Sequence, residues 1–195
     1  RNLNKGNPVS DFIQKEIMAN QWMGNINQDG TVKKLVTGVF SIYRKVFLET
    51  RFNEDPVLHD TEFSARALES IKILFEPRAI VYHRHPNSLE WLFNQRKGYG
   101  EKFPVLLEYC SSDIFNEDSL FSSLLRFMDL SDEELYSAVL KDNRKLCKGC
   151  GIKKCQIETS WLPREGSSDE YLCSLICLGF ASGILKQRTG VDYEF

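Results

Sequence analysis

A histidine and two carboxylates stand close together at the predicted start of a helix. His59, Asp60 and Glu62 precede apolar residues at helical spacing, which predicts a helix from Asp60 to Ser70. A carboxylate at a helix start is held by free backbone N–H groups and stays ionised, which suits a general base. His59 is placed to orient an acceptor beside it. Asp is also a very common helix cap, and on local evidence alone this structural role is favoured for Asp60.

Two further histidines lie at the end of a predicted strand. His83 and His85 are separated by one residue, so in extended backbone both side chains point to one face. Pro86 biases His85 toward that extended geometry. Two imidazoles on one face can share a divalent metal or contact a diphosphate. A structural alternative has about equal weight: one histidine caps the strand and the other is solvated.

A polar and basic group follows on the next predicted helix. Gln95, Arg96 and Lys97 lie within one turn of a helix that Asn87 and Glu90 open as a capping box. Arginine offers a fork of donors and lysine a point charge to a phosphate. Taken alone, the group is better explained as a solvated helix end.

The order of these features is more informative than any one of them. Thr37-Gly38, His59-Asp60, His83 and Gln95-Arg96 follow one another along the chain. This run resembles the C-terminal half of the catalytic domain of family 2 glycosyltransferases, which have the nucleotide-diphospho-sugar transferase (GT-A) fold. The resemblance covers roughly Ser10 to Phe103 and consists of many weak positions in the right order.

The resemblance implies inverting transfer of a sugar from a nucleotide-sugar donor to an acceptor hydroxyl. It implies that Asp60 is the base, although His59 stands where the family usually has Glu. It also implies a catalytic Mn²⁺ or Mg²⁺. Gln95 and Arg96 loosely resemble the family's Gln-x-x-Arg-Trp element, without its Trp. The expected site comprises Asp60 as base; Thr37, Gly38, His59 and Glu62 on the acceptor side; Gln95, Arg96 and Lys97 on the donor diphosphate; and His83 and His85 on the catalytic metal.

The donor-binding half of such a domain is not evident in the sequence. The chain contains no Asp-x-Asp motif, and no alternating βαβ pattern precedes Thr37. We therefore expect a fragment that is inactive alone. A missing N-terminal half or a partner chain would then supply the nucleotide site.

Five cysteines are concentrated in the last quarter of the chain. Cys147 and Cys150 form a C-x-x-C-G knuckle, Cys155 follows, and Cys173 and Cys177 lie one helical turn apart. This arrangement predicts structural Zn²⁺ held by Cys147, Cys150, Cys173 and Cys177, with Cys155 as a substitute ligand. An iron–sulfur cluster uses the same ligands, and small buried apolar residues are the structural alternative.

Composition limits the other possibilities. The 195 residues carry a net charge of −2, so no global field favours nucleic acid or an anionic membrane. Basic residues crowd around the cysteine knuckle without interleaved aromatics, which leaves nucleic-acid binding as the least favoured function. No apolar run is long enough to span a bilayer, and a cytoplasmic location is expected, with membrane association open for a longer protein.

The apolar periodicity of the elements that carry these residues predicts an α/β fold. It is a partial transferase-like half of mixed short strands and helices, followed by a helical, zinc-bound C-terminal segment. The predicted strands are Leu35–Tyr43, Ile71–Phe75 and Ala79–His83. The predicted helices include Ser10–Met23, Arg44–Glu49 and one from about Ser168 to Lys186, and Ser131 with Glu134 forms a second capping box.

Three segments follow from these predictions. They are an acceptor-side half over residues 1–110, a helical linker over 111–146 and a cysteine-rich metal-binding segment over 147–195. The predicted function is glycosyl transfer. The alternative is a non-catalytic, zinc-bound protein-interaction module.

Overall fold

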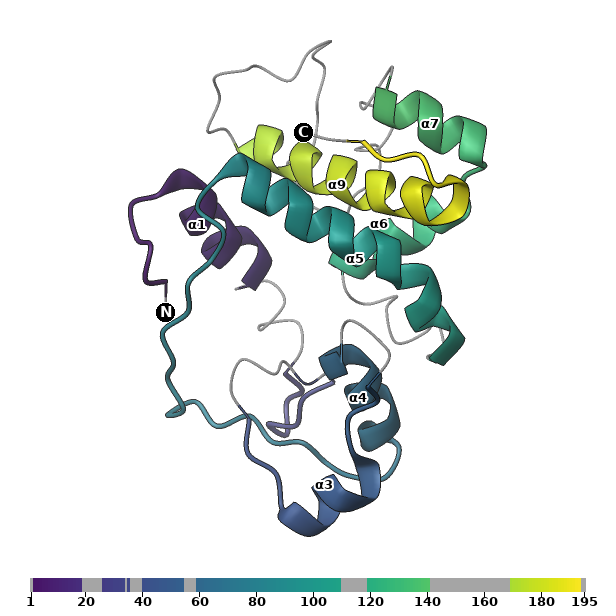
Figure 1. Ribbon diagram of the computed structural model, residues 1–195. Helices are drawn as coiled ribbons and strands as arrows, with labels where there is room; N and C mark the ends of the chain where they lie inside the picture. Colours follow the sequence, from purple (N-terminus) through teal and green to yellow (C-terminus); the bar gives the residue numbers. More distant parts are fainter. Residues whose placement is uncertain are drawn as a thin grey trace.

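The computed structural model describes residues 2–18, 26–33, 35, 40–54, 59–109, 119–140 and 169–193. Within these ranges the structure is mostly helical (Figure 1). The elements are α1 (Pro8–Phe12), the π-helical turn η1 (Ile13–Met18), α3 (Arg44–Thr50), α4 (His59–Leu68), α5 (Leu89–Tyr109), α6 (Ser119–Met128), α7 (Asp132–Leu140) and α9 (Asp169–Thr189).

The predicted α/β architecture is wrong for the part of the chain that the structure describes. Two isolated bridges lie in the stretches that were predicted to be strands: Thr31 pairs with Leu74, and Asn2 pairs with His83. Neither residues 71–75 nor residues 79–83 form a strand of a sheet. Their β-branched and aromatic side chains favour extended backbone locally, but a strand also needs a neighbour to pair its backbone groups. In the described residues, each of these two segments pairs with another segment at a single bridge only. Most of the described structure consists of packed helices instead.

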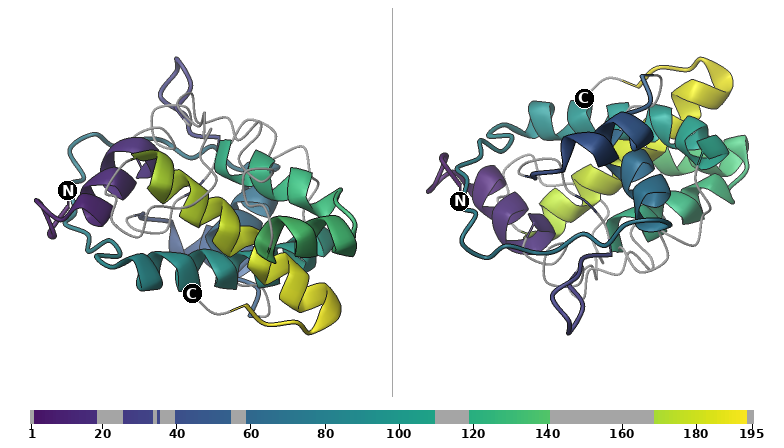
Figure 2. Two further views of the ribbon diagram at one scale, coloured as in Figure 1. Left: turned by 90° about the horizontal axis from the view of Figure 1, so that it is seen from above. Right: turned by 90° about the horizontal axis from the view of Figure 1, so that it is seen from below.

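Helices α5 and α9 form the centre of the fold. They run side by side in the same direction (Figures 1 and 2), with Gly100 near Phe180 and Gly183 near Lys97. A Cβ atom added at Gly183 would lie 2.0 Å from the Lys97 carbonyl oxygen, and one at Gly100 would lie 2.2 Å from that of Phe180. Only glycine therefore allows the two backbones to approach this closely.

One apolar core joins these helices to the rest of the helical part. It includes Phe12 of α1, Phe103 of α5, Phe127 of α6, Leu135 of α7 and Phe180 of α9. The core therefore draws on residues from all three predicted segments. A smaller cluster centred on Leu35, Phe63 and Ala67 supports α4.

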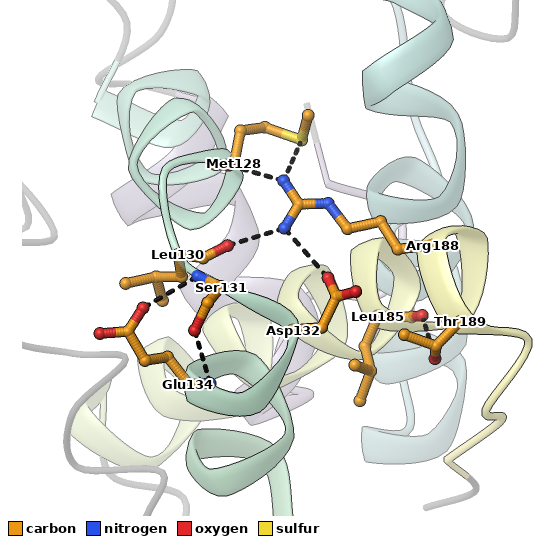
Figure 3. Close-up of polar contacts among 8 residues, drawn as sticks. All are labelled: Met128, Leu130, Ser131, Asp132, Glu134, Leu185, Arg188 and Thr189. Atoms are coloured by element: carbon orange, nitrogen blue, oxygen red, sulfur yellow. Dashed lines mark hydrogen bonds and ion pairs between the residues drawn. The ribbon is translucent and has the colours of Figure 1, made fainter.

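The turn between α6 and α7 is fixed by local caps and by one arginine of α9 (Figure 3). The predicted capping box is confirmed, because the Ser131 N–H donates to Glu134 Oε2 at 2.8 Å and the Glu134 N–H donates to Ser131 Oγ at 3.2 Å. Arg188 donates to the carbonyl oxygens of Met128 and Leu130 at 2.6 and 2.7 Å. These bonds satisfy the last carbonyl group of α6 and one carbonyl group of the turn that follows it.

Other local predictions have mixed outcomes. The helices near Arg44 and Asp60 and the last helix are confirmed as α3, α4 and α9. The helix after Asn87 is confirmed, but the side chain of Ser88 caps it by accepting from the Trp91 N–H at 3.1 Å. Among the helices of the described residues, none combines the length and the apolar composition that a membrane span requires.

Candidate functional site

Asp60 lies in the first turn of α4, as the sequence predicts. Its Oδ1 accepts a hydrogen bond from the Thr61 N–H at 2.9 Å, and its carbonyl oxygen accepts from Ser64 Oγ at 2.7 Å. His59 is exposed and its Nδ1 donates to the Asn53 carbonyl oxygen at 3.3 Å. The Asp60 side chain is partly exposed, so a proton acceptor is held at the helix start and reaches solvent.

Glu62 has a different environment from Asp60. Its side chain is buried and forms an ion pair with Arg66 one turn later on α4. Arg66 also donates to the Arg51 carbonyl oxygen at 2.7 Å, which ties α4 to the end of α3. A cavity of about 370 Å³ opens beside this pair and is lined in part by Phe52, Asn53, Glu62 and Arg66.

His83 and His85 lie together, with ring centroids 4.8 Å apart. His83 is exposed, whereas His85 is buried against the amino-terminal segment. His85 Nε2 donates to Gln14 Oε1 at 3.1 Å, and Asn4 Nδ2 donates to the His85 carbonyl oxygen at 2.9 Å. The pair therefore joins the segment before α5 to the first residues of the chain.

The environment of His85 opposes its protonation. Burial, followed by the nearby charges of His83 and Arg96, lowers the pKa of His85 from 6.5 to about 4. His85 is consequently a neutral imidazole near pH 7, able to donate from one nitrogen and accept at the other.

This burial predicts a loss of stability in mild acid. The unfolded chain takes up the proton near pH 6.5 but the folded chain only near pH 4, so the stabilisation is complete above pH 6.5 and disappears on acidification through this window. Between pH 7 and pH 4.5 the free energy of unfolding of the wild type should fall by about 2 kcal/mol more than that of His85→Gln. Urea unfolding followed by circular dichroism measures both, and equal pH profiles would contradict the burial of a neutral His85.

Arg96 is buried between α5 and α9. It is 5% exposed and lies over the rings of Tyr99 and Phe180, at 5.4 and 5.9 Å from their centroids. Its Nε has no hydrogen-bond partner, and no carboxylate pairs with Arg96 in the described part of the chain. Burial lowers the pKa of this guanidinium, which nevertheless stays charged near neutral pH. Arg96 is thus a buried cation without a counter-ion among the described residues.

The neighbours of Arg96 in the predicted basic group have different environments. Lys97 is buried, forms an ion pair with Asp192 and donates to the Tyr193 carbonyl oxygen at 2.8 Å. Asp192 also pairs with Lys186 at 3.0 Å, and the hydrogen bonds of these two lysines lower the pKa of its carboxyl group. Gln95 is half-buried. The charge of Lys97 is therefore already balanced, unlike that of Arg96.

The described residues do not suit the expected Mn²⁺ or Mg²⁺ ion. No group of three or more His, Cys, Asp or Glu side chains is gathered there. The His83–His85 pair offers only imidazole nitrogens, whereas Mn²⁺ and Mg²⁺ favour carboxylate and other oxygen ligands. We accordingly assign no step of the chemistry to a metal ion at this pair.

The predicted zinc ligands are described only in part. Cys173 and Cys177 lie on α9, each 2% exposed and within the main apolar core. Such an environment is also typical of structural cysteines that bind nothing. Cys147, Cys150 and Cys155 lie outside the described residues, as do Thr37 and Gly38 of the predicted acceptor-side turn.

The predicted site residues therefore fall into two groups. Asp60, His59 and Glu62 belong to α4, and the contacts given above for them are with other residues of α4 and with Asn53. His83, His85 and Arg96 belong to the amino-terminal half of α5 and the segment before it. Sequence reasoning missed Gln14 as the partner of His85, because no local pattern signals a contact across 71 residues.

Comparisons with protein-family models, curated proteins and solved structures find no match for this chain. The functional argument therefore depends on the residues and their geometry.

Proposed function

We propose that this chain takes part in transferring a sugar from a nucleotide-sugar donor to an acceptor hydroxyl. The observation that carries the proposal is Arg96, a buried guanidinium without a carboxylate partner among the described residues. A buried cation is costly unless an anion compensates it. The diphosphate of a nucleotide sugar has the charge and the planar oxygen pairs that a guanidinium binds best.

The histidine pair supports the same assignment. Arg96 is close enough to His85 for its charge to lower the His85 pKa, and the two imidazoles are in contact. A neutral imidazole N–H can donate to a phosphate oxygen without adding another buried charge. The exposed His83 is the member of the pair that reaches a ligand from solvent.

Asp60 supplies the chemistry on the acceptor side. In the proposed step, the Asp60 carboxylate takes the proton of the acceptor hydroxyl as the acceptor oxygen bonds to the anomeric carbon of the sugar. The bond from that carbon to the diphosphate oxygen breaks, and the nucleoside diphosphate leaves with the electron pair. Arg96 then stabilises the negative charge that develops on this leaving group.

Replacing Asp60 tests the acid–base role. In protein expressed from the complete reading frame, Asp60→Asn should lower sugar transfer by about 10²–10⁴-fold, because asparagine cannot take the proton. The measurement is release of nucleoside diphosphate from a panel of nucleotide sugars with hydroxyl acceptors, with and without Mn²⁺. Donor binding, titrated separately, should stay within about twofold of wild type.

Glu133→Gln is the matched control for this variant. Glu133 is likewise a first-turn carboxylate, on α7, and its side chain is exposed. Turnover in Glu133→Gln should equal wild type. Wild-type turnover in Asp60→Asn would show that Asp60 is not the base, whether or not donor binding is intact.

The alternative function, a non-catalytic zinc-bound interaction module, rests on the cysteine knuckle. Metal analysis of the purified protein tests it directly. The alternative is supported if the wild type holds near-stoichiometric zinc and the variant with Cys147 and Cys150 replaced by serine does not. A wild-type protein with neither zinc nor iron would rule out this function.

A further inference from the structure

A cavity lies between α7, the end of α9 and the segment that follows α9. Its volume is about 460 Å³, within the range of roughly 300–1,000 Å³ that is usual for small-molecule sites. Asp60 and Arg96 are not among the described residues that line it, so it is separate from the groups to which sugar transfer is assigned. The lining includes Asp132, Tyr136 and Ser137 of α7, Leu185 and Thr189 of α9, and Val191.

Ion pairs and hydrogen bonds fix the walls of this α7–α9 cavity. Arg188 holds the start of α7 against α9 by donating to two carbonyl oxygens at the turn between α6 and α7 (Figure 3). On the other side, Asp192 pairs with Lys186 at 3.0 Å and also with Lys97, which holds the segment that contains Val191. The cavity is therefore formed before any ligand arrives, as small-molecule sites usually are.

One side of the cavity is apolar, and the other offers groups that a ligand can bind. Leu185 and Val191 supply apolar surface, and Tyr136 presents a ring that is 42% exposed. The Thr189 hydroxyl is already used, because it donates to the Leu185 carbonyl oxygen at 2.8 Å and accepts from the Val191 N–H at 3.2 Å. The Ser137 hydroxyl makes no hydrogen bond among the described residues and is available to a ligand.

The charges around the start of α7 favour a cationic ligand. The first turn of α7 carries three carboxylates, Asp132, Glu133 and Glu134. Arg188 approaches Asp132 at 3.5 Å, but its shorter contacts, at 2.6 and 2.7 Å, are with carbonyl oxygens. Lys186 is engaged by two other carboxylates. Three carboxylates beside one arginine leave an excess of negative charge, and a ligand of opposite charge complements it.

The spacing of the lining residues suits an ammonium group in particular. Asp132 and Tyr136 lie one helical turn apart, so their side chains are neighbours on one face of α7. A carboxylate attracts an ammonium group, and the face of an aromatic ring attracts it as well. The free Ser137 hydroxyl can accept a further N–H, since an ammonium group has three to donate.

We propose that the α7–α9 cavity binds an ammonium group carried on an apolar body. The ammonium group donates to Asp132 and Ser137 and lies against the ring of Tyr136, while the apolar body contacts Leu185 and Val191. A free organic amine and a lysine side chain of another polypeptide present this same chemistry. The inference does not depend on the proposed glycosyl transfer.

Phenethylamine is the probe that tests the cavity in the intact wild-type protein. Its titration, followed by the NMR shifts of the backbone amides, should give saturable changes at residues 132–137 and 185–191. The isosteric 2-phenylethanol, which has a neutral hydroxyl in place of the ammonium group, should bind at least about tenfold more weakly, because it forms neither an ion pair nor a cation–π contact. Salt at about 1 M should weaken the binding of the amine, because it screens exposed charges.

A second titration separates the two sources of the ammonium group. The probe is N-acetyl-lysine methylamide, which carries the side chain as a polypeptide presents it. Tighter binding of this compound than of phenethylamine assigns the cavity to a lysine of another polypeptide. Tighter binding of phenethylamine assigns it to a free organic amine.

Two variants and a matched control locate the contacts. Asp132→Asn should weaken phenethylamine by about fivefold, through loss of an exposed ion pair. Tyr136→Leu keeps the apolar bulk but removes the ring, and should weaken the amine by about threefold. Glu90→Gln replaces another exposed carboxylate in the first turn of a helix, on α5, and should bind as the wild type does.

Three outcomes would overturn the proposal. The first is the absence of shift changes at residues 132–137 and 185–191 at millimolar phenethylamine. The second is equal affinity for phenethylamine and 2-phenylethanol, which would mean that the charge is not recognised. The third is equal affinity of Asp132→Asn and Glu90→Gln for the amine, which would place the ammonium group elsewhere.

Discussion

Replacing Gly183 by alanine is expected to lower the free energy of unfolding by about 3 kcal/mol or more. The new Cβ would lie 2.0 Å from the Lys97 carbonyl oxygen and 2.6 Å from the Glu101 backbone nitrogen. Both neighbours are backbone atoms of α5, so the contact is relieved only by moving the two helices apart. Separation would open the core around Phe180, which the α5–α9 contact closes.

The sign of this effect makes the test decisive. In a helix, alanine is intrinsically more stable than glycine by about 1 kcal/mol, so a purely local effect would stabilise Gly183→Ala. Gly98→Ala is the matched control on α5, because nothing lies within 4 Å of its added Cβ. Gly98→Ala should gain about 0.5–1 kcal/mol. Thermal unfolding followed by circular dichroism compares them, and similar melting temperatures would show that α5 and α9 do not pack in this way.

Replacing Arg66 by alanine is the second large expected effect, a loss of about 3–5 kcal/mol. The carboxylate of Glu62 is 2% exposed, and without Arg66 it would be a buried charge lacking its ion-pair partner. The variant also loses the hydrogen bond to the Arg51 carbonyl oxygen that joins α4 to α3. Urea unfolding at pH 7 measures the change.

Two comparisons identify the cause of this loss. Arg78→Ala removes an exposed pair with Glu76, which solvent screens, and should leave stability almost unchanged. Replacing Glu62 and Arg66 together by leucine and methionine should recover most of the stability, since no buried charge remains. If the double variant is as unstable as Arg66→Ala, the unpaired carboxylate is not the cause.

Local signals in the sequence predict the helices well. The Ser131–Glu134 capping box and the start of α4 at His59-Asp60 depend on residues within one turn, and both are confirmed. The strands predicted at 71–75 and 79–83 fail because pairing depends on residues far along the chain. Gly98 and Gly100 suggest a loosened helix end, yet α5 continues to Tyr109 and Gly100 is the contact point with α9.

In the candidate site, too, local sequence predicts some features, whereas others depend on residues far along the chain. The first-turn position of Asp60 follows from the sequence. The burial of Arg96 does not, because it depends on Phe180 of α9, which lies more than 80 residues along the chain. Lys97, its neighbour in sequence, is balanced by Asp192, while Arg96 has no such partner in the described residues. A basic pair that looks uniform in the sequence therefore contains one structural cation and one candidate ligand-binding cation.

Titration of nucleotide sugars tests the central claim most directly. We would titrate uridine, guanosine and thymidine diphosphate sugars into protein from the complete reading frame, with and without Mn²⁺, and compare His83→Asn with the exposed control His59→Asn. Glycosyl transfer that uses Arg96 and the His83–His85 pair predicts saturable binding of at least one donor. His83→Asn should weaken this binding by about tenfold, the loss of one charge-assisted hydrogen bond, and His59→Asn should leave it unchanged. Absence of binding at millimolar donor by the folded protein, or equal affinity in both variants, would contradict the account.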